Sequence, residues 1–157
     1  MATKIRQISV HLENRPGRLR ELLRALTESK IDIRALSVSV LESPDRGVAR
    51  MVVSDTDKAL DALARAGFAT TTSEVLRVVV PDQPGGLFAA VAEPLAQEDI
   101  NIEYLYAFVD QPQEAALVVL ETNEIERAAA AINRKAISEQ HWWGLQAYLK
   151  ALQGKQE

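Results

Sequence analysis

The chain has 157 residues, with 18 basic and 22 acidic side chains, a formal charge of −4 and no cysteine. Its 47% hydrophobic content is typical of a folded protein, and its length can bury one ordinary core or two small ones. The lack of cysteine excludes disulfides and thiol nucleophiles, and two histidines exclude a histidine-rich metal cluster. The acidic balance argues against a nucleic-acid partner, and no apolar run is long enough for a membrane span or a signal peptide. We therefore expect a cytoplasmic protein.

The first part of the chain predicts the order strand, helix, strand, strand. Residues 5–12 are rich in β-branched and apolar side chains and predict a strand that ends at a turn over residues 14–17. Leucines over residues 19–26 fall at helical intervals and form one apolar stripe, which predicts a helix. Residues 33–41 alternate in polarity and residues 48–53 return after a turn, which predicts a hairpin.

The middle of the chain predicts a second helix and a long strand. Acidic and hydroxyl residues at 54–57 supply an N-cap for a helix that carries Leu60 and Leu63, and Gly67 is placed to end it. Thr70–Val80 is a β-branched segment and predicts one strand long enough to serve two domains.

The rest of the chain repeats this plan. We expect a helix from Leu87 to Leu95, interrupted by Pro94 at a cost of about 3 kcal/mol, and strands over 102–109 and 115–120. A helix over 125–132 follows. The fourth strand of this part is hard to find: only Ala136 and Ile137 could begin one, and residues 139–152 have helical spacing.

The sequence contains an internal repeat, in which one unit occurs twice. Val10–Leu19 recurs as Val78–Leu87 at an offset of 68, and Ile31-Asp-Ile33 recurs as Ile100-Asn-Ile102 at an offset of 69. Each copy has the length and order of a βαββαβ domain, which stacks two helices on one face of an antiparallel sheet. The predicted division is a domain over 1–72, a domain over 73–137 and a helical tail over 138–157.

The two copies differ on the sheet face that the helices leave open. Strand alternation places the small residues Ala35, Ser37 and Ser39 there in the first copy. In the second copy it places Tyr104, Tyr106 and Phe108 there. Large aromatic side chains are seldom left in water, so we expect the Trp142-Trp143 tail, the other domain or a second chain to cover them.

Signals for catalysis are weak. The chain has no phosphate loop, nucleophile elbow, zinc-protease motif or dinucleotide fingerprint. Asp55 and Asp57 precede an apolar helical stripe and are interpreted as capping acids, and His11 and His141 as structural residues. We therefore expect no catalytic residue, no metal site and no cofactor.

The repeated turn is the sharper signal. In Asn14-Arg-Pro-Gly17 and Asp82-Gln-Pro-Gly85 a strand ends, the chain turns on Pro-Gly and a helix begins. Unpaired backbone N–H groups at a helix start suit a carboxylate, and glycine lets backbone approach a ligand closely. Pro-Gly is also a good tight turn in its own right, but its recurrence at matched positions favours a ligand site.

At these residues the chain resembles the ACT domain family, small βαββαβ regulatory modules that bind amino acids. The resemblance covers about Ile5 to Ile132, as two tandem domains without a catalytic domain. It implies a ligand between the first turn and helix of one domain and the start of the second strand of a neighbour, with the domains joined side by side through that strand. If the two second strands pair within the chain, Asn14 and Asp32 belong to opposite sites. The implied ligand-binding residues are Asn14, Arg15, Pro16, Gly17, Arg18, Leu19, Asp32 and Ile33 in the first copy, and Asp82, Gln83, Pro84, Gly85, Gly86, Leu87, Asn101 and Ile102 in the second.

Four classes of function remain open. The leading hypothesis is a non-catalytic sensor in which an amino acid binds between domains and biases their packing, with a metabolic enzyme or a second copy as protein partner. The second is an interaction module that binds no ligand and docks on a metabolic enzyme. RNA binding and an acylphosphatase-like enzyme share the βαββαβ order, but the aromatic residues lie on the wrong strand for the first, and Asn14 and Arg15 imitate the second only loosely.

Overall fold

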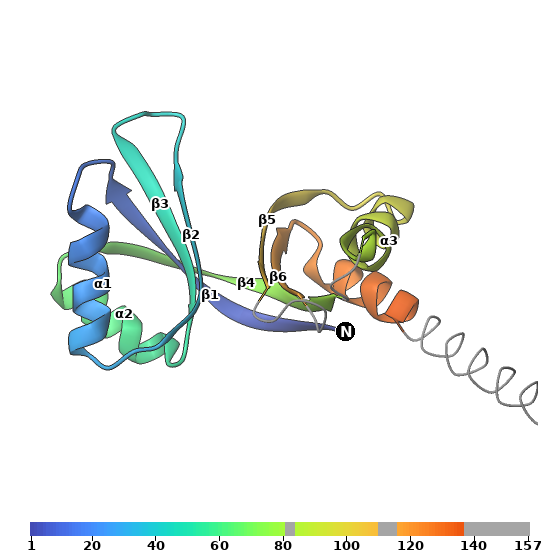
Figure 1. Cartoon of the computed structure of the whole chain (residues 1–157), viewed down its shortest axis with the longest axis horizontal. Helices are drawn as coiled ribbons and strands as arrows, with labels where there is room; N and C mark the ends of the chain where they lie inside the picture. Colours follow the sequence, from blue (N-terminus) through green and yellow to red (C-terminus); the bar gives the residue numbers. More distant parts are fainter. Residues whose placement is uncertain (81–83, 110–115, 137–157) are drawn as a thin grey trace, which may run out of the picture. The chain divides into compact units, whose positions relative to one another are not determined.

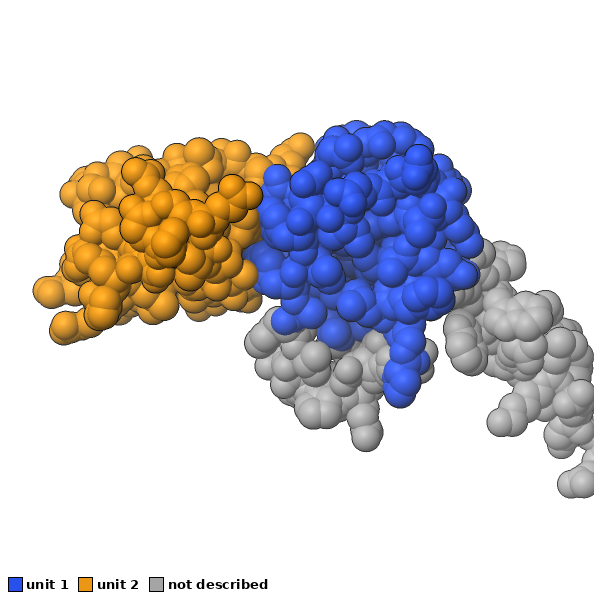
Figure 2. Space-filling view, turned by 90° about the horizontal axis from the view of Figure 1, so that it is seen from above, with its two compact units in different colours: residues 1–4, 76–157 blue, residues 5–75 orange. Residues whose placement is uncertain are grey.

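The computed structural model describes residues 1–80, 84–109 and 116–136. Six strands form a sheet in the order β2-β3-β1-β4-β6-β5. The chain divides into two compact units, shown in Figure 2: unit 2 is residues 5–75, and unit 1 is residues 1–4 with residues 76–157. Each unit has its own core, so the prediction of two βαββαβ domains is confirmed.

Unit 2 contains the first copy of the repeat. Its elements are β1 (Ala2–Glu13), α1 (Arg18–Glu28), β2 (Ile33–Val40), β3 (Arg46–Val53), α2 (Thr56–Arg65) and the first half of β4 (Ala69–Val80). The strand order is β4-β1-β3-β2, with β3 antiparallel to both β1 and β2. The helices α1 and α2 lie together on one side of these strands (Figure 1).

The core of unit 2 forms between this sheet and its two helices. The predicted leucine stripe of α1 is confirmed, because Leu22 and Leu26 are fully buried while Leu19 and Leu23 pack at the margin. Asp55 caps α2 by accepting a hydrogen bond from the backbone N–H of Lys58 at 3.0 Å, as its position before the helix predicted. The strands contribute Ile8, Val10, Leu12, Ala49, Met51 and Val53.

Unit 1 contains the second copy, with a different first helix. Residues Phe88–Ala92 form a π-helical segment, η1, which leads into the short α-helix α3 (Glu93–Gln97). Pro94 lies in the first turn of α3. In a regular α-helix a proline ring clashes with the carbonyl four residues earlier. The wider π turn before Pro94 relieves this clash and accounts for the predicted interruption of the helix. The strands β5 (Ile102–Val109) and β6 (Ala116–Thr122) follow, and then a helix over residues 125–136.

The fourth strand of unit 1 comes from the start of the chain. Of the two residues at which the sequence left room for this strand to begin, Ala136 is helical and Ile137 lies outside the described residues. Instead Met1–Lys4 belong to unit 1, and Ala2–Lys4, the first part of β1, lie beside β4 there. Asn133 holds this segment: the Ala2 N–H donates to its Oδ1 at 2.7 Å, and its Nδ2 donates to the Ala2 carbonyl at 3.2 Å. An ion pair between Lys4 and Glu126 at 2.6 Å adds to the attachment.

Two strands therefore serve both units. The prediction for β4 is confirmed, since the boundary between the units falls at Val75/Leu76 inside it. β1 has the same double role, which the sequence did not indicate. Compared with the predicted division at 1–72 and 73–137, Met1–Lys4 belong to unit 1 and residues 73–75 belong to unit 2. The predicted tail over 138–157 lies outside the described residues.

The two second strands lie at the two edges of the sheet. β2 is the first strand in the order and β5 is the last, so they do not pair with each other within this chain. β2 pairs with β3, and β5 pairs with β6. The predicted faces are confirmed by the register: Tyr104 lies opposite Glu121 and Tyr106 opposite Val119, on the face away from the core residues Leu120 and Val118.

Candidate functional site

The turn between β1 and α1 is tied to the β2–β3 hairpin. The Asn14 N–H donates to the Asp45 carbonyl at 2.8 Å, and the Asn14 side-chain Nδ2 donates to the Pro44 carbonyl at 2.7 Å. These bonds fix the orientation of the Asn14 side-chain amide, and its Oδ1 oxygen is the atom that can accept a hydrogen bond from a ligand. Gly17 then adopts a left-handed backbone, with φ of +88°, at the N-cap of α1.

The start of α1 is open toward solvent. No side chain caps this helix, and an added Cβ on Gly17 would meet nothing within 4 Å. The backbone N–H groups of Arg18 and Glu21 donate to the carbonyls of Arg15 and Gly17. The intervening N–H groups of Leu19 and Arg20 have no intrahelical acceptor by position, so they can donate to an anion placed over the turn.

A network of charged side chains surrounds this turn. Arg15 pairs with Glu13 at 2.6 Å and reaches Glu21 at 3.5 Å, while Arg18 pairs with Glu21 at 2.6 Å. Hydrogen bonding from Arg15 lowers the pKa of Glu13, and hydrogen bonding from Arg18 lowers the pKa of Glu21. Both guanidinium groups thus already hold carboxylates, so an anionic ligand here competes with Glu13 and Glu21 for them.

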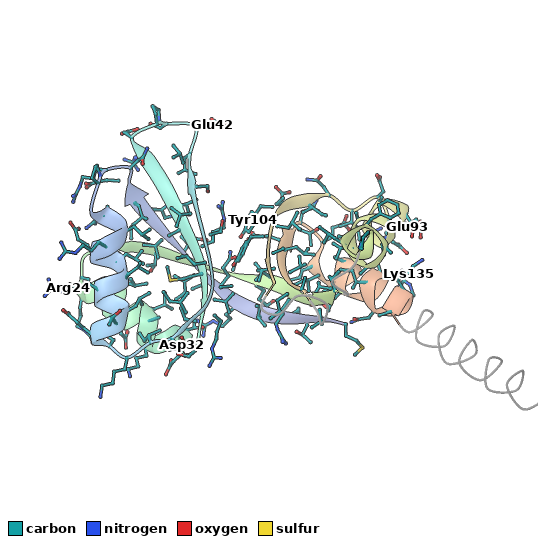
Figure 3. The ribbon with its side chains drawn as sticks, viewed as in Figure 1. Arg24, Asp32, Glu42, Glu93, Tyr104 and Lys135 are labelled. Carbon is teal, nitrogen blue, oxygen red and sulfur yellow. The ribbon has the colours of Figure 1, made fainter. Side chains whose placement is uncertain are left out.

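The second half of the predicted motif lies at the other end of α1. The helix has 11 residues, so its ends are about 17 Å apart, and Asp32 follows its C-terminus while Asn14 precedes its N-terminus. Figure 3 shows Asp32 at the end of the unit opposite Glu42 of the β2–β3 hairpin. The Asp32 carboxylate is exposed and pairs with Arg34 at 3.1 Å, whereas Ile33 packs against the core. One unit therefore cannot bring Asn14 and Asp32 to the same small ligand.

The second copy repeats these backbone features. Gly85 has φ of +83°, and the Ala89 N–H donates to its carbonyl at 2.9 Å, as the Glu21 N–H donates to Gly17 at 3.0 Å. Gly86, next to it, is buried, whereas Leu87 is exposed and comes directly before the π-helical segment η1. Asp82 and Gln83 lie outside the described residues, whereas Pro84 and Gly85 lie in a turn and are exposed.

The strand entries also match between the copies. Lys30 and Asp99 both have a left-handed backbone, with φ of 55° and 57°, directly after the first helix of each copy. The next residues, Ile31 and Ile100, are buried and close the same 6→1 hydrogen bond to Leu26 and Leu95. Both second strands then carry a register shift at their second residue. The repeated isoleucines are therefore core residues, and the polar residue between them, Asp32 or Asn101, is exposed.

A cleft adjoins the first turn and includes residues that the sequence did not single out. It measures about 340 Å³ and lies within unit 2, between β1, the start of α1, the β2–β3 hairpin and the entry to β4. Arg18 is the one predicted site residue in its lining. Its guanidinium stacks on Phe68, with 4.2 Å from the guanidinium carbon to the ring centroid. The remaining lining residues are His11, Leu12, Glu13, Leu41, Asp45, Arg46, Gly47, Gly67 and Ala69. They come together only through tertiary folding, so no sequence pattern marks them.

Residues 1–80, 84–109 and 116–136 contain no group of three or more histidine, aspartate or glutamate side chains that could hold a metal ion. None of the helices described in these ranges has both the length and the apolar character needed to cross a membrane.

Comparison with known proteins finds a matching family model and similar solved structures. A family model described as an ACT domain pair matches residues 3–141. The crystal structure of protein BT0572 from Bacteroides thetaiotaomicron is 32% identical, with a TM-score of 0.78 over 86% of this chain and 90% of that one. The ligand-free regulatory subunit of aspartate kinase from Thermus thermophilus is 18% identical, with a TM-score of 0.63 over 85% of this chain and 95% of that one. No curated protein matches the chain.

Proposed function

Because the chain belongs to the ACT domain pair family, we propose that it is a non-catalytic regulatory protein that binds an amino acid. The proposed site is the turn at Asn14–Leu19, where free backbone N–H groups take the ligand carboxylate and the Asn14 Oδ1 takes its ammonium group. The open space next to Gly17 lets the ligand approach the backbone. The regulatory role agrees with the aspartate kinase subunits that share the fold.

The separation of Asn14 from Asp32 is the observation that makes the proposed site a site between two copies of the chain. With about 17 Å of helix between them, both can contact one ligand only if Asp32 comes from a second copy of the chain. In a twofold pair with antiparallel α1 helices, the N-terminal end of one α1 faces the C-terminal end of the other. Each site then takes Asn14 from one chain and Asp32 from its partner.

The β2 edge offers a surface for such a pair. Leu36, Val38 and Val40 lie opposite Met51, Ala49 and Gly47, so they share the apolar face of the sheet. Yet Val38 is 49% and Val40 57% exposed. A hollow of about 720 Å³ along α1 has Leu19 and Leu23 in its lining. Apolar side chains beside the unpaired backbone of an edge strand favour addition of another strand, and we propose β2 of a second copy.

A thermal-shift screen against the twenty amino acids tests the function. A ligand at 100 times its Kd adds about 2.7 kcal/mol of stability, which raises the Tm of a chain of this size by about 5–10 °C. One clear hit that is lost in Asp32→Ala, but kept in the control Asp57→Ala, supports the proposal. A flat screen of a cooperatively melting protein rejects it.

A second candidate function is docking on a metabolic enzyme without a ligand. The observation in its favour is Phe88, which is 62% exposed on η1 beside the exposed Leu87. This function predicts a flat amino-acid screen together with loss of enzyme binding in Phe88→Ser. Retained enzyme binding in that variant would exclude this surface as the contact.

A further inference from the structure

We propose that the cleft of about 340 Å³ in unit 2 is a second ligand position, which binds the carboxylate of a molecule of amino-acid size within one copy of the chain. All of its lining residues belong to unit 2. It therefore differs from the proposed site at Asn14 and Asp32, which needs two copies. The inference goes beyond the proposed function, because it adds a site that does not depend on dimer formation.

Arg18 carries the argument for a carboxylate. Among the described residues, its Nε–H is the one buried side-chain polar group without a hydrogen-bond partner. Its Nη1 is held by Glu21 at 2.6 Å, and the guanidinium plane is held against Phe68. The edge formed by Nε and Nη2 is the geometry that accepts a carboxylate through two parallel hydrogen bonds. A carboxylate in the cleft would satisfy the buried donor and leave the Glu21 pair in place.

The rest of the lining suits a small molecule with both charges. Asp45 and Glu13 add carboxylates that can attract an ammonium group, and Arg46 adds a second cation. Leu12, Leu41 and Ala69 provide apolar walls. The volume lies at the lower end of the range for small-molecule sites, which favours a ligand of amino-acid size.

Nuclear magnetic resonance of the full ¹⁵N-labelled chain tests this proposal directly. The probes are the twenty amino acids and succinate at millimolar concentrations, and the signals are the Arg18 Nε–H and the backbone amides of Leu41, Gly47 and Ala69. We expect at least one probe to shift all of these signals in a saturable way. If no probe shifts them, the proposal is overturned.

Matched variants show whether the probe binds in the cleft itself. Arg18→Met removes the donor but keeps an apolar stem on Phe68, and should weaken binding by about tenfold or more. Arg24→Met, on the exposed side of α1, should leave binding unchanged. Ala69→Leu fills the cleft without touching Arg18 and should abolish binding, whereas Thr71→Leu on the same strand should not. Binding that survives both Arg18→Met and Ala69→Leu would overturn the proposal.

One further variant separates this site from the proposed function. Asp32→Ala removes the contact that a second copy would supply, and it lies at the far end of α1 from the cleft. We expect the cleft signals to shift with the probe in this variant as they do in the unchanged chain. Loss of the cleft signals in Asp32→Ala would assign them to the two-copy site and overturn the second position.

Discussion

Substitution of Asn133 tests whether the attachment of Met1–Lys4 stabilises unit 1. Its side chain makes two hydrogen bonds to Ala2, at 2.7 and 3.2 Å, and Ala2 itself is 6% exposed. Asn133→Ala removes both bonds, each of which contributes about 1 kcal/mol. We therefore expect a loss of about 2 kcal/mol in the free energy of unfolding, or about 4–8 °C in Tm for a chain of this length.

Urea denaturation with hydrogen exchange is the assay for this variant. Loss of the attachment should speed amide exchange in residues 76–80 of β4, which lie beside the released segment. Asn101→Ala is the matched control, because it makes the same chemical change at an exposed position. Glu126→Ala should cost less than about 1 kcal/mol, since its ion pair with Lys4 is exposed. An Asn133→Ala variant as stable as Asn101→Ala would refute the role of the N-terminal segment.

Three further outcomes are expected. Lys30→Gly should raise the stability of the chain by up to about 1 kcal/mol because it relieves a left-handed backbone, whereas Ser29→Gly, at φ of −88°, should lower it; calorimetry checks both. Asp55→Ala should cost about 1 kcal/mol by removing the N-cap of α2, measured by urea denaturation. Hydrogen bonding from Arg15 lowers the pKa of Glu13 in the folded chain, so this pairing stabilises the fold at pH values above the unfolded pKa near 4.5. The stabilisation is lost as the pH falls through the lower pKa of the folded chain. Glu13→Gln should therefore be less stable than the unchanged chain at pH 6, with a difference that vanishes in acid; a constant difference across this range would contradict the assignment.

The sequence predicted the elements of unit 2 well because local signals agree there. The stripe of α1, the Asp55 cap and the glycine after α2 each act within a few residues of chain, and tertiary packing reinforces them. The shared use of β4 was also predictable, since its β-branched run is too long for one domain.

The predictions failed where distant parts of the chain meet. The role of Met1–Lys4 depends on Asn133, 131 positions from Ala2, and nothing near either residue marks the contact. The π turn of η1 could be anticipated only as an interruption at Pro94.

The candidate site shows the same limit. The repeated turn was recognised with its left-handed glycines, but the matched Ile-Asp-Ile and Ile-Asn-Ile segments owe much of their likeness to buried isoleucines. The helix predicted over residues 19–26 already separates Asn14 from Asp32, but the sequence did not show that the separation excludes a site within one copy. The structure gives this helix 11 residues, or about 17 Å, which is too long for one small ligand to span.

Mixing two defective variants tests the two-copy site most directly. Asn14→Ala and Asp32→Ala should each fail to bind the amino acid found in the thermal-shift screen. After unfolding and refolding together, half of the pairs contain both chains, and each such pair regains one intact site. Calorimetric titration should then recover about a quarter of the original binding capacity at the original affinity. No recovery in a mixture shown to contain mixed pairs, or full binding by either variant alone, would contradict the two-copy site.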